Sequence, residues 1–155
     1  MKSEIIQVHL IIGKKPVINY VEKNITDDVG EWGTNTISLK MKIDGDEYAN
    51  SKFFDNMECA IIDLHKQLPA EIHIECCQTC KYGNYCPFGN YDNEIFCLKG
   101  FCPKNKMDVA ELFTKYSDVQ HNTLLYWYCG YDRVNTEYYS YNDWTYAFND
   151  GKNYT

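Results

Sequence analysis

The sequence contains no apolar run long enough to cross a membrane, which would take about 20 residues. The apolar stretch at residues 5–12 is short and is interrupted by Gln7 and His9. The first residues, MKSEIIQ, also lack the long apolar segment and the cleavage site of an export signal. These absences predict a cytoplasmic protein with no membrane partner.

Clustered basic residues are also missing. The chain of 155 residues carries a net charge of −7, and its densest basic cluster is the short patch of Lys99, Lys104 and Lys106. Nucleic-acid binding needs grouped Lys and Arg side chains to neutralise phosphates. We therefore expect no nucleic-acid partner. An acidic surface is compatible with a protein partner, although solubility alone is the simpler explanation.

The motifs of several enzyme classes are absent as well. The sequence has no glycine-rich phosphate loop, no nucleophile elbow and no H-E-x-x-H zinc motif. These absences favour a non-enzymatic protein-interaction module over an enzyme. By analogy with other small acidic proteins, the module is expected to be an immunity or accessory protein.

The residues that are present predict a β-rich N-terminal part. Side chains alternate with a period of two at 5–12, 17–22 and 36–43, which indicates antiparallel strands. Residues 24–35 contain two glycines and few apolar side chains, and are predicted to form a loop. In the third strand four apolar side chains share one face and are expected to be buried: Ile37, Leu39, Met41 and Ile43.

The period changes to that of a helix at residues 52–68. Asp55 and Glu58 predict how this helix begins, and Pro69 predicts its end. The spacing of its apolar residues predicts one buried stripe, which consists of Met57, Ile61, Leu64 and Leu68.

A strand is predicted at 70–76, a second helix at 106–116 and a late strand at 124–129. The fold class that follows is α+β: an antiparallel β-sheet with one or two helices on one face and a cysteine-rich loop. A chain of this length fits a single domain, residues 1–155.

Eight cysteines are the most informative feature, because in a reducing compartment they are metal ligands or free thiols rather than disulfides. Cys77-Gln78-Thr79-Cys80 has the spacing of half a structural zinc site. The second half is predicted to be Cys97 with Cys102, Cys97 with Cys129, or Cys86 as a local ligand. The remaining two, Cys59 and Cys76, are expected to be buried and inert.

Other interpretations of the cysteines stay open. The thiols can simply pack in the core, or Cys77 and Cys80 can form a redox pair, although the nearby glycines and proline disfavour the helix that thioredoxin-like chemistry uses. An iron–sulfur cluster has no supporting spacing. The alternative function is a zinc- or thiol-dependent enzyme of unknown substrate, in which Asp92 or Glu94 would serve an open zinc position.

One histidine lies close to the cysteine pair. The order His73-Ile74-Glu75 before Cys77 and Cys80 is superficially that of zinc deaminases, but the two motifs are too close together and no proline precedes the first cysteine. We therefore expect His73 to be an outward-facing strand residue.

The run CCQTCKYGNYCPFGN, followed by IFCLKG and WYCGYDR, resembles a family of small uncharacterised bacterial proteins. The resemblance covers roughly residues 55–133 and implies a bacterial, cytosolic protein without implying an activity. In similar members the position of Cys86 is often Ser. The resemblance therefore favours zinc binding by the set Cys77, Cys80, Cys97 and Cys129, with Cys102 as an addition in this chain.

The C-terminal part is rich in aromatic residues. Tyr and Trp suit protein-binding surfaces because they offer a large contact area at a low cost in entropy. The rings are Tyr126, Trp127, Tyr128, Tyr131, Tyr138, Tyr139, Tyr141, Trp144, Tyr146 and Phe148. The competing interpretation, which we favour, is that Trp127 and half of the tyrosines fill the core or cover the cysteine-rich loop.

Overall fold

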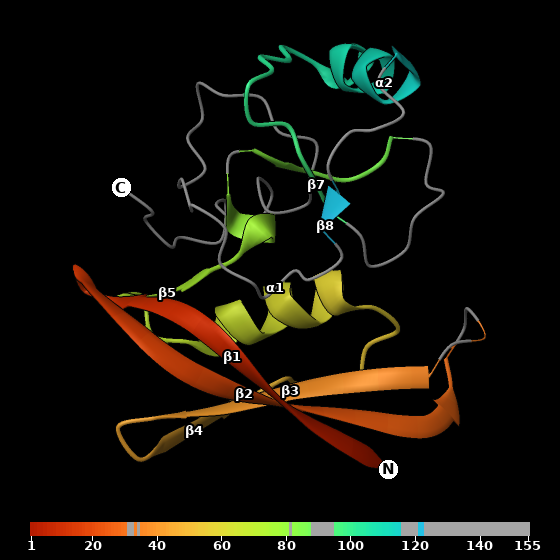
Figure 1. Cartoon of the computed structure of the whole chain (residues 1–155). Helices are drawn as coiled ribbons and strands as arrows, with labels where there is room; N and C mark the ends of the chain where they lie inside the picture. The colour runs from red at the N-terminus through yellow and green to blue at the C-terminus, as the bar shows by residue number, and fades with distance from the viewer. Residues whose placement is uncertain (31–32, 34, 81, 88–94, 116–120, 123–155) are drawn as a thin grey trace. The chain divides into compact units, whose positions relative to one another are not determined.

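The computed structural model describes residues 1–30, 33, 35–80, 82–87, 95–115 and 121–122 (Figure 1). Contacts between Cα atoms divide the chain into two compact units, Met1–Ile74 and Glu75–Thr155. The predicted fold class is confirmed, because the chain combines an antiparallel sheet, a second small sheet and helices. Among the described residues, no helix is both long enough and apolar enough to cross a membrane.

A five-stranded sheet forms most of the first unit, with the strand order β4-β3-β2-β1-β5 (Figure 1). Neighbouring strands from β1 to β4 pair antiparallel. The strands are β1 (Lys2–Ile12), β2 (Lys15–Val29), β3 (Asn35–Ile43), β4 (Asp46–Ala49) and β5 (Ile72–Glu75).

The alternation of side chains determines which face of each strand is buried. On β3 the four predicted apolar residues are all buried, while Lys40 and Lys42 lie on the other face. On β1 the buried face carries Ile6, Val8 and Leu10. Because a strand exposes alternate side chains to opposite faces, these two strands line the same core layer.

The predicted loop at residues 24–35 is wrong over much of its length, since β2 continues to Val29. The strand continues beyond its apolar part because polar side chains there bond to the neighbouring strand. The hydroxyls of Thr26 and Thr36 lie 2.6 Å apart in a hydrogen bond between β2 and β3, and Val29 pairs with Asn35. The short strand β4 was not predicted, because it offers only four residues after the Asp44-Gly45 turn.

The first helix, α1 (Met57–Gln67), lies across one face of the sheet (Figure 1). It begins at Asn56, whose side chain accepts a hydrogen bond from the Cys59 backbone, so the prediction that Asp55 starts the helix is wrong by one residue. The predicted stripe is confirmed, because all four of its members are buried: Met57, Ile61, Leu64 and Leu68.

A polar network joins α1 to the segment after β4. Asp63 accepts hydrogen bonds from the Ser51 backbone and hydroxyl, each at 2.8 Å, and from the Asn50 amide at 3.0 Å. Asn50 also accepts from the Leu39 backbone and donates to the Ala60 carbonyl. Burial alone would raise the pKa of Asp63, but the hydrogen bonds from Ser51 and Asn50 outweigh it and leave the pKa lowered.

Because its pKa is lowered on folding, ionised Asp63 stabilises the folded state above the unfolded pKa of about 3.9, and this contribution is lost as the pH falls through the folded value. We expect Asp63→Asn to lower the free energy of unfolding at pH 7 by about 1–3 kcal/mol and to remove that acid-dependent component. Urea unfolding at pH 7 and pH 3 measures both effects. Asp46→Asn, at the exposed first residue of β4, is the matched control. An equal loss in both variants would contradict the role of the network.

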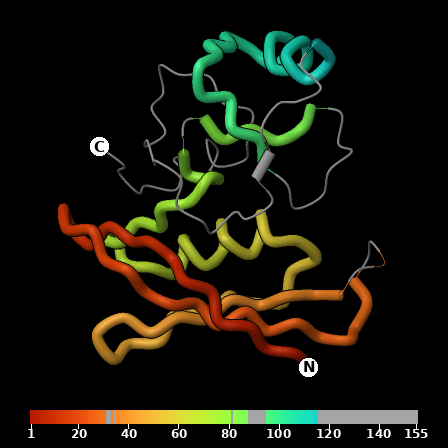
Figure 2. The backbone as a smooth tube through the Cα atoms, viewed as in Figure 1, coloured from red at the N-terminus to blue at the C-terminus, as the bar shows by residue number. Residues whose placement is uncertain are grey.

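Apart from one α-helix, the described elements of the second unit are each only two or three residues long (Figure 2). A three-stranded sheet has the order β6-β7-β8, and Phe96 on β7 packs edge-on against Phe113 with ring centroids 4.7 Å apart. The second helix confirms the prediction at 106–116 to within one residue. The predicted strand 124–129 and the aromatic tail lie outside the described residues. The described elements of the second unit are η1 (Cys77–Thr79), β6 (Gly83–Asn84), β7 (Ile95–Cys97), α2 (Lys106–Lys115) and β8 (His121–Asn122).

Candidate functional site

The cysteine pair predicted from the sequence lies at the two ends of one tight turn. Residues Cys77–Thr79 form the 3₁₀ turn η1, and the Cys80 backbone N–H donates to the Cys77 carbonyl at 3.3 Å. The Thr79 hydroxyl closes the turn by donating to the Cys76 carbonyl and accepting from the Cys76 N–H, each at 3.1 Å. Gln78 and Thr79 are buried, so the turn is an internal feature of its unit.

Gly83 brings Cys97 beside this turn. It pairs with Cys97 across the β6–β7 ladder, and a Cβ atom built on Gly83 would collide with the Cys77 carbonyl oxygen. The same Cβ direction meets the Ile95 side chain at 3.0 Å. Because Cys97 is two residues after Ile95 on one strand, both side chains lie on the face that adjoins Cys77.

Three of the four predicted zinc ligands therefore lie in the same described region. Cys77 and Cys80 are buried and Cys97 is half-buried. Cys129 lies outside the described residues. Within the described part of the chain, no three His, Cys, Asp or Glu side chains are close enough together to hold a metal ion. The three described cysteines therefore share one small unit without forming a ready-made three-ligand site.

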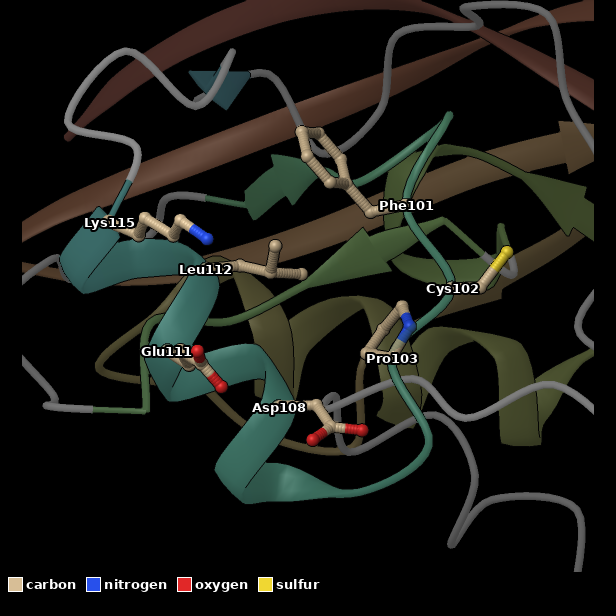
Figure 3. Close-up of a pocket in the computed structure, with 7 residues that line it drawn as sticks. All are labelled: Phe101, Cys102, Pro103, Asp108, Glu111, Leu112 and Lys115. Atoms are coloured by element: carbon tan, nitrogen blue, oxygen red, sulfur yellow. The ribbon is translucent and has the colours of Figure 1, made fainter.

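The other candidate ligands are distributed differently. Cys86 is buried, whereas Cys102 is exposed. Cys102 lines an open pocket of about 230 Å³ beside α2, together with Asp108, Glu111 and Lys115 (Figure 3). The carboxylates proposed for an open zinc position, Asp92 and Glu94, lie outside the described residues.

The two cysteines expected to be inert differ from each other. Cys76 is buried as predicted, and burial raises the pKa of its thiol to about 11, so it stays protonated at neutral pH. Cys59 is exposed, so the prediction that it is buried is wrong. Its position on α1 is about 200° around the helix from Met57, which faces the sheet.

His73 is buried, so the prediction that it faces outward is wrong. Residues Ile72–Ile74 on β5 are buried on both faces of the strand, and alternation therefore does not distinguish an exposed side. The His73 ring lies against that of His65 from α1, with the centroids 5.9 Å apart. The pairing of these two imidazoles was not predicted, because one belongs to a helix and the other to a strand.

A second candidate site is the face of the five-stranded sheet opposite α1, here called the outer face. Three large apolar side chains on β1 and β2 are exposed there: Ile5 at 69%, Ile18 at 57% and Tyr20 at 57%. The register brings them together, because Gln7 pairs with Tyr20 and His9 pairs with Ile18. One feature of the sequence indicated an exposed apolar face: residues 5–12 are largely apolar on both sides of the strand.

Polar groups surround the apolar residues of the outer face. A shallow hollow of about 340 Å³ is lined there by residues that include Ile5, Tyr20 and Lys42. Glu22 accepts from the Ser3 hydroxyl at 3.2 Å and lies 3.4 Å from the Lys40 ammonium. These two contacts, the hydroxyl first, lower the pKa of Glu22 because both favour its ionised form.

Comparisons with family models, curated proteins and solved structures give no match to this chain. The resemblance of the cysteine segment to small bacterial proteins therefore stays a prediction.

Proposed function

We propose that this chain is a non-enzymatic protein-interaction module that binds a protein partner through the outer face of its five-stranded sheet. The observation that carries the proposal is the exposure of Ile5, Ile18 and Tyr20 on adjacent strands. Single exposed apolar residues are ordinary on soluble proteins, whereas a group of large ones marks an interaction site. Tyr is also among the residues that contribute most to binding energy.

The hollow on the outer face supports this function. Its lining combines apolar surface from Ile5 and Tyr20 with charged groups from Glu22 and Lys40. Protein interfaces have the same arrangement of an apolar centre and a polar rim. We expect the module to act in the bacterial cytoplasm, as an immunity or accessory protein does.

We also propose a structural role for the cysteine-rich unit, with zinc bound by Cys77, Cys80, Cys97 and Cys129. The support is the placement of Cys77 and Cys80 on one turn, with Cys97 on the adjoining strand. The first three side chains would have to close in on the ion, because they are not a preformed set. Four thiolates make a closed structural site, whereas the alternative enzyme would need three protein ligands and a water.

Photo-crosslinking from inside the proposed interface tests the function. We expect a photoreactive residue in place of Gln7, an exposed position opposite Tyr20, to form a specific covalent adduct with a protein in cells that produce the chain. The same residue in place of Lys14, in the exposed β1–β2 turn, is the matched control and should give none. Mass spectrometry identifies the attached protein. The absence of adducts from Gln7, or equal adducts from both positions, would overturn the proposal.

A further inference from the structure

The charges of the outer face form a self-complementary pattern. The strand register places Ile5, Glu22, Lys40 and Ala49 in one row across β1 to β4. Two residues further along the strands, the same face carries Gln7, Tyr20, Lys42 and Glu47. Each row therefore has an acidic residue and a basic residue on different strands.

This face is neutral on a strongly acidic chain. Its four charged residues in the two rows, Glu22, Lys40, Lys42 and Glu47, cancel, while the whole chain carries −7. Like charges repel, so contacts between two copies through other parts of this acidic surface are disfavoured. Among the described residues, the two rows of the outer face combine balanced charges with exposed apolar side chains on adjacent strands.

We propose that the partner bound by the outer face is a second copy of this chain. The inference rests on the proposed function and names its partner. Two sheets pack face to face about a twofold axis that runs along the strands between β2 and β3. This axis places β2 of each copy over β3 of the other. Glu22 of one copy then faces Lys40 of the second copy, and Tyr20 faces the aliphatic stem of Lys42.

The size of the face determines how strong this contact is. Four strands spaced about 4.8 Å apart, over about six residues of about 3.3 Å each, span a face of roughly 20 by 20 Å. Stable interfaces bury about 800 Å² per partner, and the roughly 400 Å² of this face is only about half of that. The dimer is therefore weak and depends on protein concentration.

Two charge reversals and their mixture test the pairing. The full chain is measured by light scattering and sedimentation equilibrium from about 10 µM to about 1 mM. The mass of the unchanged chain should rise from 18.2 kDa towards twice that value. Glu22→Lys places Lys against Lys40 across the twofold axis, and Lys40→Glu places Glu against Glu22. Each variant alone should weaken self-association about tenfold or more.

An equimolar mixture of the two variants should restore association, because each reversed charge then faces an opposite one in the other copy. Lys14→Glu in the turn at the end of the sheet is the control for a change of net charge and should associate like the unchanged chain. Circular dichroism verifies that each variant is folded. A chain that stays monomeric to about 1 mM, or variants that fail to recover on mixing, would overturn the inference. Crosslinking from Gln7 to a different protein would then leave the proposed function intact.

Discussion

Substitution of Leu64 by Ala is expected to lower the free energy of unfolding by about 2–5 kcal/mol. Leu64 is 1% exposed and belongs to the stripe of α1 that packs on the sheet. Its truncation removes buried apolar surface and leaves a cavity that the rigid sheet beneath cannot fill. Denaturant unfolding followed by circular dichroism gives the change directly.

The matched control is Ile5→Ala, which truncates a side chain of the same size on the opposite face of the sheet. Ile5 is 69% exposed, so this change should alter the free energy of unfolding by less than about 0.5 kcal/mol. Both variants are measured at low protein concentration, where the outer face is not in contact with another copy. Equal losses in the two variants would mean that α1 does not cover the sheet as described.

Removal of the zinc that we propose is expected to have the largest effect of any treatment, because a structural zinc site can contribute free energy on the order of 10 kcal/mol to folding. The segment from Cys77 to Cys97 has few aliphatic residues with which to stabilise itself by burial. Its described secondary structure consists of one 3₁₀ turn and two very short strands. We therefore expect chelation to loosen this segment before any part of the five-stranded sheet.

Amide hydrogen exchange distinguishes the two regions. Exchange across residues 77–100 should become faster when a chelator is added, while exchange in β1, β2 and β3 stays unchanged. The competing interpretation, in which the thiols only pack in the core, expects no response to the chelator. Uniformly faster exchange over the whole chain would contradict the separate role of the cysteine-rich unit.

The main sheet and helix follow from patterns that lie within single elements. The alternation in β3 and the helical stripe that contains Leu64 need no information from distant residues, and both are confirmed. The extension of β2 to Val29 depends on a hydrogen bond between Thr26 and Thr36, a contact made only after the strands pair. Local composition therefore predicted a loop where tertiary pairing makes a strand.

The same distinction between local patterns and tertiary contacts applies to the site residues. The turn from Cys77 to Cys80 is a local motif, so its spacing predicted it. The position of Cys97 beside the turn depends on strand pairing with Gly83, and the sequence leaves this pairing open. His73 was assigned to the wrong side because β5 is buried on both faces, and burial on both faces removes the meaning of alternation.

Metal analysis of protein purified without added metal tests most directly our proposal that zinc holds the cysteine-rich unit together. We expect about one zinc per chain, released with loss of order across residues 77–100, as for a closed four-thiolate site. X-ray absorption at the zinc edge then counts four sulfur ligands. Less than about a tenth of an equivalent of zinc or iron, with this segment still protected from exchange, would contradict the claim.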